Sequence, residues 1–192
     1  METAINNEQI SDNHLMVRYR DGDIDAFNEL YARYKTSLYR FMVNSCSTES
    51  IAAELYQDVW ARVVNGRHGY STSAPFAAWL YRIARNRLTD FYRSNKNNNL
   101  TTSLDFENDT HVTQLQTTLL PEEITELSTR KDALSVALAK LPDEQREVVL
   151  LRHIAGFGIQ EIADLVDENT ETVKSRLRYA FTKLRKQLRM LS

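Results

Sequence analysis

Two stretches of the sequence concentrate side chains whose chemistry suits nucleic acid. Between Arg82 and Lys96, five basic residues stand against one acidic residue and are interleaved with aromatic residues such as Tyr92. Between Lys174 and Arg189, seven basic residues stand against no acidic one. Basic side chains neutralise phosphates, and an exposed aromatic ring can stack on an unpaired base. The two stretches therefore predict nucleic-acid-binding surfaces; the alternative is an ordinary basic face that is only solvated.

The overall charge hides this segregation. The formal net charge is −2, yet residues 97–129, between the two basic stretches, hold six acidic residues and no lysine or arginine. Two basic segments with an acidic segment between them indicate more about binding partners than the net charge does. The single cysteine, Cys46, excludes an internal disulfide and a thiolate metal cage. The four histidines share no ligand spacing, so we expect no metal and no other cofactor.

The apolar runs of the sequence are too short for membrane insertion. The longest are five residues at 76–80 and four residues at 148–151, whereas a spanning helix needs about 20. The first residues carry no basic segment followed by an apolar one, so no signal peptide is expected. These features favour a cytoplasmic protein.

The composition predicts an all-α fold. The 192 residues include only five glycines and three prolines, and alternating β-branched patterns are almost absent. Residues 95–127 lack an apolar period and are rich in polar and acidic side chains, which predicts a flexible acidic linker. We therefore expect a disordered tail at 1–11 and two small helical domains, at 12–94 and 128–192, joined by this linker.

In the first domain, helices are expected from Asp12, from Asp25 as an N-cap, at about 48–64 and at 74–93. Pro75 suits the first turn of the last helix, which is about 27 Å long and could reach across a DNA backbone. The residues expected to point inward from it are Phe76, Trp79, Leu80 and Ile83. The opposite face is left to arginine, asparagine and threonine.

The helix at 48–64 carries a polar stripe opposite its apolar side. Glu54, Gln57 and Asp58 recur at the three- and four-residue spacing of one helix face. A compact stripe of acids and an amide could meet a basic partner surface. Taken alone, a solvated face is the simpler interpretation.

The second domain ends in a helix-turn-helix pattern. A short helix is expected after Gly158, a tight turn at 167–169 and a long basic helix from Thr170. On a helical wheel, Ser175 and Arg178 lie opposite the apolar side of that long helix. Hydroxyl and guanidinium groups there could read base edges or hold phosphates. The alternative is a basic amphipathic helix that binds a protein or membrane surface.

With these elements placed, the chain resembles the bacterial RNA polymerase sigma factors of the extracytoplasmic-function (ECF) branch of the sigma-70 family. The resemblance covers about residues 12–94 and 128–190. It rests on motifs in the family's order and spacing, which lie at 21–34, 53–60 (Ala-Glu-Leu-Tyr-Gln-Asp-Val-Trp), 79–93, 141–152, 161–165 (Glu-Ile-Ala-Asp-Leu) and 172–177 (Thr-Val-Lys-Ser-Arg-Leu).

The resemblance implies a promoter-specificity subunit with no catalytic centre. Such a subunit binds core RNA polymerase, recognises the −35 and −10 elements of promoter DNA and helps to melt the duplex; an anti-sigma factor is a further candidate partner. The implied contacts to core polymerase are Glu54, Gln57 and Asp58. The implied −10 contacts are His68, Tyr70, Tyr81, Arg82, Arg85, Asn86, Thr89 and Arg93. The implied −35 contacts are Lys174, Ser175, Arg176, Arg178 and Tyr179.

Four positions depart from the family pattern. Asp167 replaces a usual glycine of the turn, Glu168 replaces an apolar residue, and Gly158 replaces a serine N-cap. Glu171 replaces a glycine on the predicted DNA-facing side. A carboxylate there could accept from cytosine N4 or interact with the N-terminus of its own helix, and we expect the second. These departures leave the −35 sequence preference open.

A stand-alone helix-turn-helix regulator, whose first half binds an effector or dimerises, is the main alternative function. Such a regulator would bind its operator alone, whereas a sigma factor would bind weakly until core polymerase is added. An enzyme is a weaker alternative, because the sequence has no nucleophile–base pair and no glycine-rich phosphate loop.

Overall fold

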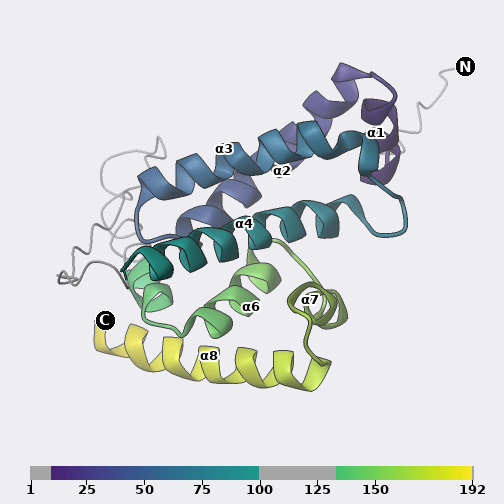
Figure 1. Cartoon of the computed structure of the whole chain (residues 1–192). Coiled ribbons are helices and arrows are strands. Elements are labelled where there is room, and N and C mark those ends of the chain that lie inside the picture. Colours follow the sequence, from purple (N-terminus) through teal and green to yellow (C-terminus); the bar gives the residue numbers. More distant parts are fainter. Residues whose placement is uncertain (1–9, 100–132, 192) are drawn as a thin grey trace, which may run out of the picture.

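The computed structural model describes residues 10–99 and 133–191, and every regular element in these two ranges is a helix. The prediction of an all-α fold with two helical domains is confirmed (Figure 1). The first domain contains α1 (Asp12–Arg20), α2 (Ile24–Ser45), α3 (Glu49–Gly66), the short 3-10 helix η1 (Arg67–Gly69) and α4 (Phe76–Asn99). The second contains a helical segment at 133–139, α6 (Asp143–His153), α7 (Ile159–Val166) and α8 (Thr170–Leu191).

Polar side chains fix the starts of the first three helices. Ser11 and Thr48 cap α1 and α3 through their hydroxyl groups. The carboxylate of Asp23 accepts from two first-turn amides of α2, so the N-cap predicted at Asp25 is wrong by two residues. Arg18 explains the difference, because its guanidinium lies 2.6 Å from Asp23 and holds that carboxylate beside the helix start.

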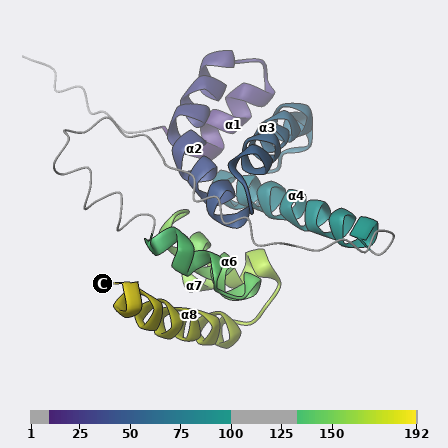
Figure 2. The ribbon, with the colours of Figure 1, turned by 90° about the vertical axis from the view of Figure 1, so that its left-hand side faces the viewer.

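The helix α4 lies between two groups of helices. Figures 1 and 2 show α1, α2 and α3 on one side of it and α6, α7 and α8 on the other. Its buried residues therefore spread over an arc of about 140°, wider than one amphipathic stripe. They are Phe76, Leu80, Tyr81, Ala84 and Leu88. The predicted inward face is displaced as a result: Trp79 and Ile83 are only partly buried.

The helix-turn-helix is formed by α7, a short turn and α8. Asp167 ends α7 in the left-handed conformation, with a φ of 57°; glycine adopts this conformation most easily, and aspartate tolerates it. Asn169 caps α8 by accepting from the amide of Thr172 at 2.8 Å. At the start of α7, Gly158 has no side-chain acceptor, but its own amide donates to Glu161 Oε2 at 2.7 Å. The family departures at Asp167 and Gly158 are thus accommodated locally.

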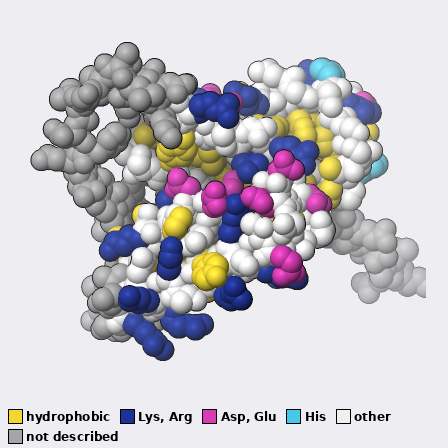
Figure 3. All heavy atoms as spheres, turned by 60° about the horizontal axis from the view of Figure 1, so that its bottom comes forward, with side chains coloured by type: hydrophobic (Ala, Val, Ile, Leu, Met, Phe, Trp, Pro, Cys, Tyr) yellow, Lys and Arg dark blue, Asp and Glu magenta, His cyan; other side chains and the backbone are white. Residues whose placement is uncertain are grey.

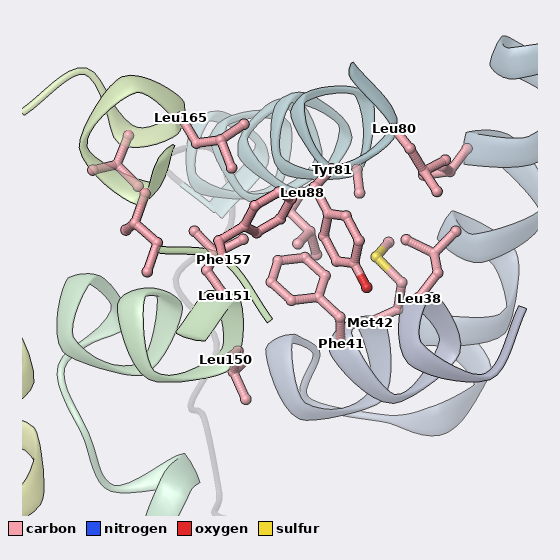
Figure 4. Close-up of a cluster of buried hydrophobic side chains, with 14 of the residues drawn as sticks. Leu38, Phe41, Met42, Leu80, Tyr81, Leu88, Leu150, Leu151, Phe157 and Leu165 are labelled. Atoms are coloured by element: carbon pink, nitrogen blue, oxygen red, sulfur yellow. The ribbon is translucent and has the colours of Figure 1, made fainter. Parts of the chain in front are cut away.

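The two domains pack against each other. Contacts run between α2 and α6 and between α4 and α7. In Figure 4, Phe41 of α2, Tyr81 of α4 and Phe157, just before α7, lie in one apolar cluster with Leu151. The centroid of the Tyr81 ring is 5.3 Å from that of Phe41 and 5.3 Å from that of Phe157. The core is therefore continuous from one domain to the other.

The first domain extends further along the chain than predicted. The helix α4 continues to Asn99, past the expected domain end at residue 94. Residues 1–9 of the tail expected at 1–11, and residues 100–127 of the linker expected at 95–127, lie outside the described residues. Within the described ranges, no helix combines the length and the apolar character needed to cross a membrane.

Candidate nucleic-acid and polymerase interfaces

A polar stripe runs along the outer face of α4. Arg82, Asn86, Thr89 and Arg93 are all exposed and recur at spacings of three and four residues, which places them on one side of the helix. The hydroxyl of Thr89 donates to the carbonyl of Arg85 at 3.0 Å. We call these four residues the α4 stripe. They are open to solvent, as predicted, and their contact with DNA stays a prediction.

Tyr81 does not belong to this surface, which corrects the prediction that it contacts DNA. Its side chain is 1% exposed, and Figure 4 shows its hydroxyl pointing toward Leu38 and Met42 of α2. Burial raises the pKa of this phenol. No hydrogen bond of ordinary geometry reaches the hydroxyl in the described part of the chain, although the side chain of Ser37 lies near it and partly offsets the rise in pKa. Tyr81 is a core residue because α4 is covered on two sides.

Arg85 is also predicted to contact DNA, but in the structure it bridges the two domains. Its Nε donates to Glu147 Oε1 on α6 at 2.7 Å. Its terminal nitrogens donate to the carbonyls of Leu165 and Val166, at 2.9 and 3.4 Å. These carbonyls lie in the last turn of α7, where helical partners are missing and a cation is favoured.

The loop before α4 contains two predicted −10 contacts, which the structure places differently. His68, in η1, is exposed. Tyr70 is 4% exposed, and its ring packs on Trp79 with centroids 5.2 Å apart. The prediction that Tyr70 contacts DNA is therefore wrong for this conformation: its phenol supports the loop from inside, and burial raises its pKa.

Asn13 of α1 holds this loop in place, and the sequence pattern does not reveal it. Its Oδ1 accepts from the hydroxyl of Tyr70 at 2.9 Å and from the amide of Phe76, the first residue of α4, at 2.7 Å. Its Nδ2 donates to the carbonyl of Ala74 at 3.5 Å. One half-buried amide thus ties α1 to both ends of segment 70–76. Its partners lie 57 to 63 residues away, so no local signal could have identified it.

The polar stripe of α3 is brought together as predicted, with one difference. Glu54 and Gln57 are exposed. Asp58, whose side chain is 45% exposed, forms an ion pair with Arg87 of α4 at 2.8 Å. Asp58 therefore faces both solvent and α4, whereas the other two residues face solvent.

The N-terminal half of α8 presents an open polar surface. Lys174 and Arg178 are exposed, Ser175 is half-buried, and Tyr179 is 54% exposed. The Arg178 guanidinium lies 5.1 Å from the centroid of the Tyr179 ring, a cation–π distance. Glu171 forms an ion pair with Lys174 at 2.7 Å. This carboxylate therefore partly neutralises the nearest basic group of the same surface.

Arg176, also predicted as a −35 contact, points elsewhere. Its side chain is 17% exposed and pairs with Glu144 of α6 and Glu168 of the turn, each at 2.8 Å. It ties α8 to the turn and to α6, so its predicted DNA contact is wrong for this conformation. The family departure at Glu168 supplies one of its two partners.

Beyond the predicted contacts, the basic face of α8 continues toward its C-terminus. A shallow hollow of about 400 Å³ is lined by Thr182, Arg185, Lys186 and Arg189. Figure 3 shows Lys and Arg side chains gathered at the lower left of this side of the molecule, over the C-terminal half of α8. No group of three potential metal ligands occurs within residues 10–99 and 133–191.

In the described residues, a helix-turn-helix occurs together with a second helix that carries an exposed polar and basic stripe, a combination typical of DNA-binding proteins. Comparison with known families is more specific. The sigma-70 region 2 model matches residues 30–98, and the sigma-70 region 4 model matches residues 137–186.

Full-length relatives agree. The chain is 30% identical over 179 residues to the ECF RNA polymerase sigma factor RpoE of Cereibacter sphaeroides, and the match covers 91% of this chain and 93% of the relative. It is 29% identical over 167 residues to the ECF sigma factor SigX of Bacillus subtilis, covering 87% and 86% of the two chains. The chain therefore belongs to the ECF branch of the sigma-70 family, and it is a promoter-specificity subunit of RNA polymerase. The stand-alone regulator is not favoured.

Solved structures show the same fold. CnrH, in complex with the cytosolic domain of CnrY, superposes with a TM-score of 0.69 at 24% identity, over 94% of this chain and 99% of CnrH. The sigma factor RpoE of Bartonella quintana, in complex with the anti-sigma factor NepR, superposes with a TM-score of 0.72 at 21% identity, over 85% and 96% of the chains.

Proposed function

We propose that this sigma factor engages core RNA polymerase and promoter DNA through three separate surfaces, and that it has no catalytic centre of its own. The observation that carries the proposal is the exposure of all three in one molecule. They are the acidic stripe of α3, the α4 stripe and the N-terminal half of α8. Residues 10–99 would serve as region 2, and residues 133–191 as region 4.

For the −10 element, the α4 stripe and the loop at 67–75 would hold the non-template strand as it unpairs. Arg82 and Arg93 would bind phosphates, and the amide of Asn86 could pair with a base edge. Among the exposed residues of this loop, His68 in η1 carries the ring that could stack on a base. Because Tyr70 and Tyr81 are buried, stacking on those two rings is not part of the proposal.

For the −35 element, the N-terminal half of α8 would enter the major groove, as recognition helices do. Arg178 and Lys174 would meet bases or phosphates there, with Ser175 and Tyr179 beside them. The basic residues lining the hollow at Arg185 and Arg189 would add phosphate contacts that carry no sequence information. Glu171 would keep Lys174 from binding phosphate as strongly as it otherwise could, since the two are ion-paired.

For polymerase, Glu54, Gln57 and Asp58 would dock on a basic surface of the core enzyme. An anti-sigma factor is a further proposed partner, because the similar sigma factor of Bartonella quintana was solved with one. The proposed compartment is the cytoplasm, where RNA polymerase meets the chromosome.

Run-off transcription tests the proposal directly. Core RNA polymerase would be mixed with fragmented genomic DNA, with and without this protein. New defined transcripts are expected only with the protein, and they should be lost in the Arg178→Ala variant. No new transcript, or tight sequence-specific gel shifts by the protein without core polymerase, would instead support a stand-alone regulator.

A further inference from the structure

Arg176 of α8 joins three parts of the second domain. Its Nη2 donates to Oε1 of Glu168, in the turn between α7 and α8, at 2.8 Å. The same nitrogen lies 2.8 Å from Oε2 of Glu144, in the first turn of α6. Only 17% of the Arg176 side chain is exposed, although it carries a full charge. We call these three side chains the Arg176 clamp.

Glu168 connects the clamp to α7 as well. Its backbone amide donates to the carbonyl of Ala163 in α7 at 3.0 Å, while its carboxylate accepts from α8. The residue before it, Asp167, has the left-handed conformation that ends α7. In Figure 1, α8 runs beneath α6 with α7 at its N-terminal end. Glu168 therefore relates α8 to the helix before it through its backbone on one side and its charge on the other.

The clamp lies on the side of α8 that is turned away from the proposed DNA surface. Arg176 and Arg178 are two residues apart, which is about 200° around a helix, so their side chains leave opposite sides. Lys174, in contrast, is only about 40° from Arg178, and these two residues are both exposed. Arg176 therefore does not share their surface while the clamp is formed.

Apolar packing alone would leave the orientation of α8 loosely defined. Val173, Leu177 and Ala180 are buried and hold α8 against the rest of the domain, but apolar burial is non-directional. A guanidinium donates in fixed directions, so the clamp limits how far α8 can rotate or slide. Contacts to base edges require an accurately placed helix, and the apparent affinity falls with the fraction of molecules in which the arrangement is correct.

We propose that the Arg176 clamp is a positioning device for −35 recognition, which holds α8 at the angle at which its outer face meets the major groove. The proposal rests on the proposed −35 role of α8. It predicts an inverted effect of charge: removal of Glu144 or Glu168 weakens promoter recognition, although acidic groups ordinarily repel DNA. If Arg176 were instead a DNA ligand restrained by its acidic partners, removal of either acid would free it and strengthen binding.

The test uses holoenzyme assembled from core polymerase and full-length variants. One probe is a duplex promoter fragment recovered by run-off transcription, and the other is the same fragment with its −35 segment replaced by unrelated sequence. The ratio of the two affinities, the −35 preference, measures recognition by α8. The dependence of promoter affinity on salt measures phosphate contacts, and circular dichroism checks the fold of each variant.

Each acidic partner of Arg176 has a matched control. Glu168→Ala is compared with Asp164→Ala, which removes the same charge from the exposed side of α7. Glu144→Ala is compared with Asp143→Ala, which removes the same charge from the same first turn of α6, where the carboxylate pairs with Arg146. The controls leave the clamp in place, so they should not change the −35 preference.

Glu168→Ala and Glu144→Ala are each expected to lower the −35 preference by about two- to fivefold, the range of a partly exposed ion pair. Arg176→Ala should lower it by about tenfold, because both pairs are lost and a half-buried carboxylate is left unpaired. Its salt dependence should match that of the wild type. Arg185→Ala, which removes a proposed phosphate contact, should instead reduce the slope of log affinity against log salt by about one.

The positioning role is overturned if the Glu168 and Glu144 variants keep or exceed the wild-type −35 preference. It is equally overturned if Arg176→Ala reduces the salt slope as Arg185→Ala does, since Arg176 would then be a phosphate contact. Wild-type holoenzyme that prefers the native −35 segment in either case leaves the proposed function intact. Wild-type holoenzyme that binds both probes equally overturns the −35 role of α8, and the positioning role with it.

Discussion

The Nε atom of Arg87 on α4 lies 2.8 Å from Oδ2 of Asp58 on α3. This ion pair joins the helix proposed to dock on polymerase to the helix proposed to meet the −10 element. Both helices also contribute buried residues to the same core, among them Val59 of α3 and Leu80 of α4. The polar stripe of α3 (Glu54, Gln57 and Asp58) and the α4 stripe therefore belong to one rigid unit. Binding of α3 to polymerase would then fix the position of α4.

Charge reversal at Glu54 and at Asp58 distinguishes docking on core polymerase from the structural role of the Asp58–Arg87 ion pair. Glu54→Arg should abolish co-purification with core polymerase without changing thermal unfolding, because Glu54 is exposed and has no ion pair among the described residues. Asp58→Arg should also abolish it, and should in addition lower stability by about 1 kcal/mol or less, the value of a partly exposed ion pair. Asp90→Arg on the exposed side of α4 is the matched control and should co-purify normally. Retained co-purification of the Glu54 variant would remove α3 from the interface.

Because the hydroxyl of Tyr81 is buried, its removal in Tyr81→Phe is expected to leave the stability of the protein unchanged or to raise it. In Tyr81→Phe, the ring contacts with Phe41 and Phe157 remain and an unpaired buried polar atom disappears. Unfolding by urea should show equal stability or an increase of up to about 1 kcal/mol, and transcription should not change. Tyr81→Ala should cost about 3–5 kcal/mol, as large aromatic deletions do. A Phe variant of normal stability that transcribes poorly would return this hydroxyl to the DNA surface.

Asn13 should control the shape of the loop at 70–76, although it is not itself a predicted DNA contact. Asn13→Ala leaves the Phe76 amide and the Tyr70 hydroxyl without their acceptor, and it should cost about 1–3 kcal/mol. Asn13→Asp keeps an acceptor beside the first turn of α4, where negative charge is favoured, and should restore most of that loss. Thermal unfolding measures the stability, and permanganate reactivity of unpaired thymines measures promoter melting. Equal melting by the Ala and Asp variants at a temperature where both are folded would show that the loop shape is unimportant.

Cys46 should be a slow nucleophile in the folded protein. Burial raises the pKa of its thiol to about 11 from the ordinary value of 9.0, even though Arg146 acts in the opposite direction. Because the thiolate is the reactive form, a pKa of about 11 in place of 9.0 lowers the thiolate fraction at pH 8 by about 100-fold. Alkylation by iodoacetamide, followed by mass spectrometry, should therefore be much slower in native protein than in urea. Similar rates in the two states would contradict the burial of this thiol.

Local signals were sufficient for the helices and for the helix-turn-helix. The short helix after Gly158, the turn at 167–169 and the long helix from Thr170 all lie where the pattern of turn-forming and apolar residues places them. The left-handed Asp167 stands where the family uses glycine, and its φ of 57° gives the physical reason for that preference. Three- and four-residue spacing likewise identified the exposed residues of the α3 and α4 stripes.

Contacts between distant segments account for the errors. Periodicity reveals one apolar face and so places Tyr81 and Arg85 on the outside of α4, whereas α4 is covered by region 4 as well. The partners of Arg85 lie 62 to 81 residues away. The prediction for Arg176 fails for a similar reason, since its acidic partner on α6 is far along the chain. The local sequence places Tyr70 in an open loop, because its hydrogen-bond partner Asn13 lies far away along the chain.

Exchange of halves between sigma factors meets an obstacle in the junction of α4 with α6 and α7. A chimera that carries region 4 of a relative would bring its own promoter-reading helix intact. It would, however, match Arg85 to whatever side chain the donor supplies where Glu147 stands here, and Tyr81 to whatever replaces Phe157. Modular swaps would therefore weaken the packing between the two regions even when both DNA specificities are transferred, and matching the side chains at these two places would restore it.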